Sequence, residues 1–273
     1  MFRAPDTKTK ARTLFAMAEV IYHSIVRNLR SSHRNAVIGL VLTMVQSLVM
    51  IIAFLVMFML LGVKSSPIRG DFLLFVMSGI FMFMTHIKTV SSVAGGGSPV
   101  AAMMQHAPMN TIIGIISAAV STLYQQVLTM MIILSVYHIA ITPITIHNPV
   151  GAFGMLLLSW FSGVAVGMLF LALNPWIPDL AGLIRSMYIR INMIASGKMF
   201  VVNTLPATMV SIFDWNPLFH IIDQTRGFVF LNYNPHVTSI SYPIYLSLTL
   251  IMIGLMGEFY TRKSVSVSWF ASR

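Results

Sequence analysis

A long stretch without charge constrains this chain more than any other feature of its sequence. From Thr89 to Pro178 there is no Asp, Glu, Lys or Arg. Charged residues make up only 9% of the chain and hydrophobic residues 57%, whereas about a quarter of an ordinary soluble domain is charged. So few charges cannot cover a fold that faces water on every side. We therefore expect an integral membrane protein.

Apolar runs of spanning length follow one another along the chain. A helix needs about 20 mostly apolar residues to cross a bilayer, and short polar, proline or glycine clusters separate the runs. We expect an all-α membrane domain over residues 36–260, preceded by a cytoplasmic tail and interface helix (1–35) and followed by a cytoplasmic tail (261–273). The six expected spans are residues 36–61, 72–93, 111–136, 150–173, 180–202 and 239–257.

Residues 11–34 have the pattern of an amphipathic helix. An apolar face lies opposite a face that carries Arg27, Arg30 and Arg34. This pattern is typical of a helix that lies in the membrane interface. The alternative is a solvated helix whose basic residues set the membrane topology.

The positive charge is placed as a topology signal. An even number of spans puts both termini on one side, and basic residues gather before the first span and after the last. The positive-inside rule therefore places both termini in the cytoplasm. Since the net charge of +10 flanks apolar spans, it does not indicate nucleic-acid binding.

Three cations interrupt the fifth expected span: Arg185, Arg190 and Lys198. At about 1.5 Å per residue, Arg190 lies roughly 15 Å from the cytoplasmic end of that span. A charge at that depth costs at least about 2.5 kcal/mol and nearly always faces a polar cavity or a partner. We predict a pathway for an anionic or heavily hydroxylated substrate. The alternatives are an arginine paired with a carbonyl or a neighbouring subunit, or a span placed differently.

The sequence gives no sign of catalysis. It has no nucleophile elbow and no His-Glu metal motif, and Gly197-Lys198 lacks the other residues of a phosphate-binding loop. We expect no catalytic residue, no metal site and no cofactor on this chain. The first four spans also lack the carboxylate that an ion-coupled carrier usually needs, so another polypeptide should supply the energy for transport.

The segment 203–242 is polar in a chain that is otherwise largely apolar. Its apolar pieces, Val210 to Phe213 and Leu218 to Ile222, are too short to cross a bilayer. We predict an outer re-entrant hairpin that acts as a gate; a plain folded loop is the alternative. The turn is expected at Asn216-Pro217, and the cluster that holds it at His220, Asp223 and Arg226.

With these motifs the chain resembles the membrane subunit of an ABC-2 type exporter, and it is most similar to capsule and other polysaccharide export permeases. The most specific point of likeness is Asn216-Pro217 followed by His220, Asp223 and Arg226, which is similar to the family's signature ahead of the last span. The amphipathic entry helix, the six spans and a short helix at 98–106 add to it. The chain departs from the family at Val41 to Met44, where a Leu-Trp pair and a proline often stand.

The resemblance implies a homodimer in the bacterial inner membrane with two ATP-binding subunits beneath it, which would hold ATP and magnesium. It implies export of a lipid-linked polysaccharide, with membrane lipids around the dimer and Arg185, Arg190 and Lys198 along the route. The residues implied to contact the ATPase are Ser98, Pro99, Val100, Met103, Gln105, Arg27, Arg30 and Arg34. Open alternatives are export of another amphiphile, such as a lipid or drug, a self-contained channel or carrier, and an enzyme acting on lipid-linked sugars.

Overall fold

The computed structural model describes residues 10–31, 36–62, 68–96 and 111–271, with side chains described for 18–29, 37–62, 68–96 and 111–261. Within these ranges the regular elements are helices, joined by short connections. Their bounds are α1 Lys10–Ser31, α2 Ala36–Leu60, α3 Phe72–Gly96, α4 Thr111–Ala140, α5 Pro149–Leu173, α6 Pro178–Ala195, α7 Ala207–Phe213, α8 Pro217–Val229 and α9 Ser241–Ala271, with a 3-10 turn at Val202–Thr204.

Five described helices are long and apolar enough to cross a membrane: α2, α3, α4, α5 and the first part of α9. The protein is therefore a multi-pass helical membrane protein. Helix α6 is not among the five, because three of its 18 residues are charged: Asp179, Arg185 and Arg190. A sixth crossing by α6 stays a prediction.

The fifth expected span ends earlier than residue 202. Helix α6 stops at Ala195, and Gly197 takes a φ of +77°. This left-handed conformation is cheap only for glycine and turns the chain away from the helix axis. Lys198 consequently follows the helix and is not part of it, which corrects the boundary predicted from hydrophobicity alone.

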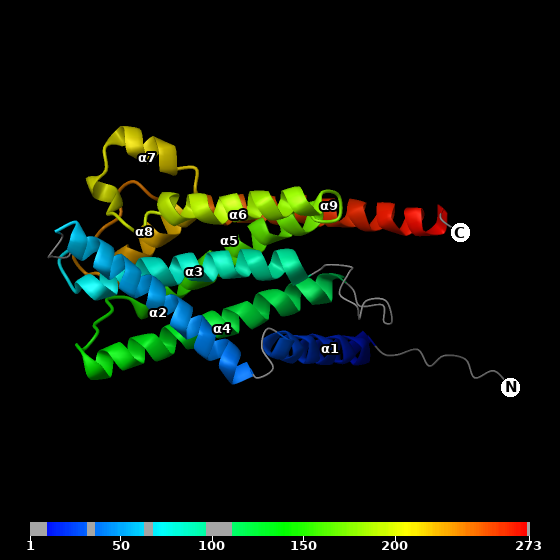
Figure 1. Cartoon of the computed structure of the whole chain (residues 1–273), viewed down its shortest axis with the longest axis horizontal. Coiled ribbons are helices and arrows are strands. Elements are labelled where there is room, and N and C mark those ends of the chain that lie inside the picture. Colours follow the sequence, from blue (N-terminus) through cyan, green and yellow to red (C-terminus); the bar gives the residue numbers. More distant parts are fainter. Residues whose placement is uncertain (1–9, 32–35, 63–67, 97–110, 272–273) are drawn as a thin grey trace.

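The long helices form one bundle with two different ends (Figure 1). Helix α1 and the C-terminal end of α9 lie at one end, and α7 and α8 lie at the opposite end. Helix α1 packs against α4, where the Asn28 amide donates a hydrogen bond to Ser117 Oγ at 3.2 Å. This arrangement has both ends of the described chain on the same side of the bundle. Membrane-interface placement of α1 stays a prediction.

Helix α3 is the centre of the bundle. Every residue from Leu74 to His86 is buried, and α3 contacts α2, α4, α5 and α8. On the facing side of α5, a Cβ added to Gly163 would meet the His86 carbonyl oxygen at 2.8 Å, and one added to Gly167 would meet Val93 Cβ at 2.8 Å. Small residues allow the two backbones to approach closely, as in other membrane helix pairs.

Candidate functional site

Helix α6 has one packed face and one open face. Ala181, Asn192 and Ala195 are buried, at the spacing of one helix face. The other face carries large apolar side chains that are exposed. Two of them, Leu183 and Met187, are more than half exposed. The helix is therefore attached to the bundle along a narrow stripe.

Two polar contacts hold the packed face of α6. His86 of α3 contacts Ser162 Oγ of α5 through Nδ1 at 2.9 Å and the Tyr188 hydroxyl of α6 through Nε2 at 2.8 Å. Ser162 Oγ donates its proton to the Ser159 carbonyl, so His86 Nδ1 carries a proton and donates to Ser162, while Nε2 accepts from Tyr188. This buried imidazole joins three helices.

The second contact lies at the end of α6. The Asn216 side-chain amide donates to Asn192 Oδ1 at 2.9 Å and to the Ala195 carbonyl at 3.0 Å. Asn216 Oδ1 accepts from the Leu218 backbone N–H at 3.0 Å and so caps α8, with Pro217 at its first position. Asparagine and proline are favoured at these two positions. Asn216-Pro217 thus lies at the junction of α7 and α8 and ties it to α6.

The open face of α6 carries the predicted pathway cations. Arg190 is exposed and Arg185 half-buried. Neither makes a hydrogen bond or ion pair with any part of the chain that the structure describes. Arg190 is thus surrounded by exposed apolar side chains and remains free to meet a polar partner outside the single chain.

Lys198, predicted beside those two arginines, lies elsewhere. Its side chain is 2% exposed, with Nζ at 3.3 Å from the Phe83 ring centroid and 5.2 Å from that of Phe54. Nζ has no hydrogen-bond partner among the described residues, and burial lowers the pKa of this ammonium to about 7. The turn at Gly197 directs the side chain into the bundle, so the structure does not bring it onto the open face of α6.

Arg226 of α8 is the largest fully buried side chain described. Its Nη1 donates to the carbonyls of Gly197 and Phe200 at 3.0 and 2.6 Å, and its Nη2 donates to that of Lys198 at 2.8 Å. The guanidinium carbon lies 4.1 Å from the Phe75 ring centroid. Burial lowers the pKa of Arg226 to about 10, so the group stays charged at neutral pH and holds the 197–200 turn.

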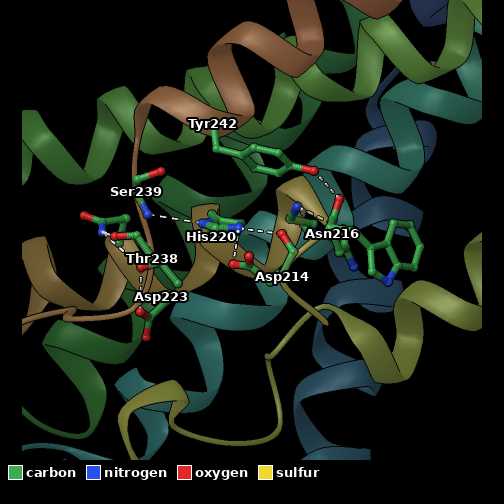
Figure 2. A network of polar contacts seen from close by, with 10 residues as sticks. Asp214, Asn216, His220, Asp223, Thr238, Ser239 and Tyr242 are labelled. Atoms are coloured by element: carbon green, nitrogen blue, oxygen red, sulfur yellow. Dashed lines mark hydrogen bonds and ion pairs between the residues drawn. The ribbon is translucent and has the colours of Figure 1, made fainter. Parts of the chain in front are cut away.

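His220 binds a different part of the same segment (Figure 2). Its Nδ1 accepts from the Ser239 backbone N–H at 3.1 Å, and its Nε2 therefore carries a proton and donates to the Asp214 carbonyl at 2.8 Å. The Asp214 carboxylate lies 3.2 Å from Nε2, and the Tyr242 hydroxyl donates to the Trp215 carbonyl. The ring joins the start of α8 to the chain just before α9.

Asp223 forms a third, separate contact. It accepts hydrogen bonds from the Tyr233 hydroxyl and, at 2.7 Å, from Thr238 Oγ1. Burial raises the pKa of its carboxyl. Nearby Arg226 and His220 offset part of that rise. His220, Asp223 and Arg226 follow one another at three-residue spacing, so they share one side of α8. Among the described contacts these three side chains do not hydrogen-bond one another. Asp223 and His220 hold the adjacent residues Thr238 and Ser239, and Arg226 holds the 197–200 turn.

The predicted ATPase contacts are only partly visible. Arg27 is exposed on α1, whereas the side chains of Arg30 and Arg34 and all of Ser98, Pro99, Val100, Met103 and Gln105 lie outside the described residues. Within the described chain no group of three or more His, Cys, Asp or Glu residues is placed to hold a metal ion.

Sequence reasoning missed two parts of this site. One is the contact of His86 with Ser162 and Tyr188, whose members lie far apart in the chain. The other is the stripe of Phe75, Gly79 and Phe83 on α3, which receives Arg226, the 197–200 turn and Lys198. The four-residue spacing of this stripe could have been recognised in the sequence, because such positions share a helix face.

Comparison with known proteins does not assign this chain to a family. No protein-family model matches this chain, and no curated protein matches it. The assignment of a function therefore rests on the residues and their geometry.

Proposed function

We propose that this chain is the membrane subunit of an ATP-driven exporter of the ABC-2 type, which moves a lipid-linked polysaccharide outward across the bacterial inner membrane. Two copies would form the pathway, and two separate ATPase subunits would supply the energy. This chain would be a transport subunit with no catalytic residue or bound cofactor of its own.

The observation that carries the proposal is the open face of α6. An exposed, unpaired Arg190 among exposed apolar side chains is unfavourable against lipid. A polar pathway between two copies of the chain would cover this face and give the arginine a hydrated or anionic neighbour. Arg185, half-buried one and a half turns earlier, would lie along the same route.

The division of the molecule into two ends supports the same proposal. Helix α1, with Arg27 exposed, and the end of α9 lie at the same end of the bundle, where an ATPase could contact them. The α7–α8 segment lies at the other end (Figure 1), where it would form the re-entrant outer gate. Under this proposal α6 is the sixth crossing helix, and both termini are cytoplasmic.

The choice of energy source rests on the sequence of the spanning helices. Helices α2, α3, α4 and α5 contain no Asp or Glu. Carriers driven by protons or sodium ions usually place a carboxylate within the membrane. An external ATPase is thus the simpler source of energy.

Reconstitution tests this function. The chain would be placed in liposomes with the ATPase encoded beside its own reading frame and a fluorescent polyprenyl-linked oligosaccharide. We expect transport that needs ATP and stops when the ATPase carries an inactive Walker A lysine. Transport without ATP, or the lack of any ATPase that associates with the chain, would reject the proposal. Transport of a simple lipid or drug but not of the glycolipid would favour the alternative amphiphile exporter.

A further inference from the structure

A cavity of about 360 Å³ lies where three connections of the chain meet. These are the segment before α3, the α4–α5 connection and the chain that follows α8. The volume is within the range of small-molecule sites, roughly 300–1,000 Å³. The lining residues that matter are Arg69, Asp71, Thr145, His147, Phe230 and Asn232.

Four polar side chains in this cavity are unengaged. Within the described chain, the side chains of Arg69, Thr145, His147 and Asn232 make no hydrogen bond or ion pair. They come from three segments that are distant in the sequence, yet they line one space. Such a group of available donors can bind several oxygens of one ligand.

The acidic residue of the cavity is already engaged. Asp71 accepts hydrogen bonds from the Leu73 backbone N–H at 2.9 Å, from Thr142 Oγ1 at 3.2 Å and from the Tyr137 hydroxyl. Its carboxylate therefore holds the start of α3 against α4. The oxygens of Asp71 are thus occupied, whereas the donors of the Arg69 guanidinium are available, and their planar fork suits a carboxylate or phosphate.

The floor of the cavity is apolar. Leu74 and Phe230 line it and are 6% exposed each. Gly70 adopts a φ of +154°, and a Cβ there would lie 2.8 Å from the Phe230 ring. Only glycine allows the backbone beside Arg69 to rest on that ring. An apolar floor below a rim of hydrogen-bonding groups suits a ring with a hydrophobic face and polar edges.

We infer that this cavity binds an acidic sugar residue, with Arg69 on the anionic group and Thr145, His147 and Asn232 on the hydroxyls. The inference rests on the proposed function in one respect: it places a glycan-binding site at the end of the bundle where an exported chain would emerge. It adds a site apart from α6 and from the α8 contacts described above.

Direct binding tests the site without transport. The full-length purified protein would be titrated with tri-galacturonate, with the neutral maltotriose and with inorganic phosphate. We expect tri-galacturonate to bind at least about tenfold more tightly than maltotriose, and Arg69→Gln to weaken it about ten- to a hundredfold. Thr145→Trp should also abolish binding by filling the cavity. Lys88→Gln, which removes a cation near the other end of α3, should leave binding unchanged.

Each other outcome contradicts the inference. Equal binding of the neutral and acidic trisaccharides would show that Arg69 does not select charge. Binding of phosphate alone would show an anion site without a sugar site, and unchanged binding in both cavity variants would place the sugar elsewhere. ATP-driven export without tri-galacturonate binding would reject this site only, whereas binding without any ATPase partner would reject the proposed function only.

Discussion

Two arginines of this chain show opposite uses of the same side chain. Arg226 on α8 is fully buried, with three backbone carbonyls and an aromatic ring around it. Arg190 on α6 is exposed and has no such partner within the described chain. A buried charge must be paired where it lies, so Arg226 has a structural role. Arg190 is available to a partner or a substrate. Burial and partners, not residue type, separate a structural cation from a functional one.

The largest expected effect comes from removing the buried Arg226. Arg226→Ala would leave carbonyls of the 197–200 turn without donors, at a cost of about 3 kcal/mol or more in unfolding free energy. Arg226→Lys should recover little, because an ammonium lacks the planar fork. Thermal unfolding in detergent measures this. Arg185→Ala on the open face should change stability by less than about 0.5 kcal/mol; equal losses in the two variants would remove the distinction.

The surface that receives Arg226 should be nearly as sensitive. A Cβ at Gly79 would lie 2.9 Å from Lys198 Cβ, 3.1 Å from its Cα and 3.2 Å from Arg226 Nη2. We expect Gly79→Ala to cost about 1–3 kcal/mol by overpacking. Gly154→Ala on α5 is the matched control, since nothing lies within 4 Å of a Cβ there. A stable Gly79→Ala protein would mean that the turn can shift away from α3.

The available arginine should matter for transport and not for folding. Arg190→Gln is expected to lower the export rate about tenfold, equivalent to about 1.4 kcal/mol, because the open face of α6 would lose its charge. Its melting temperature and its association with the ATPase should equal those of the unchanged protein. A variant that folds and exports normally would show that Arg190 is not part of a pathway.

Lys198 is expected to make the stability of the fold depend on pH. Burial lowers its pKa to about 7 in the folded protein, from an ordinary value of 10.5. Between these values the unfolded chain binds more protons, so this group makes the fold more stable as pH rises from about 7 toward 10.5. We expect the melting temperature of the unchanged protein to rise relative to that of Lys198→Met over this range. A constant difference would show that the ammonium is not desolvated.

The hydrophobic pattern predicted the positions of the helices better than it predicted where they end. Runs of spanning length predicted α2, α3, α4 and α5 to within a few residues, because lipid requires long apolar helices. The predicted end of α6 was wrong because apolar residues continue to Val202, while the backbone turns at Gly197. The three-residue spacing of His220, Asp223 and Arg226 showed that they share one side of a helix. It could not show their bonding partners, because those lie in distant segments such as the 197–200 turn.

The sequence by itself determined that this chain is a multi-pass helical membrane protein, since so few charges and such long apolar runs leave no soluble fold. It also identified Asn216 and Pro217 as a junction, because capping chemistry is local. Only the tertiary structure decided which cations are buried and which are open. That depends on contacts between distant segments, such as the 197–200 turn and α8, and no local pattern encodes them. Within the stretch from 203 to 242, three side chains therefore hold the short helix α8 in place. One of them, Arg226, binds the turn that follows α6.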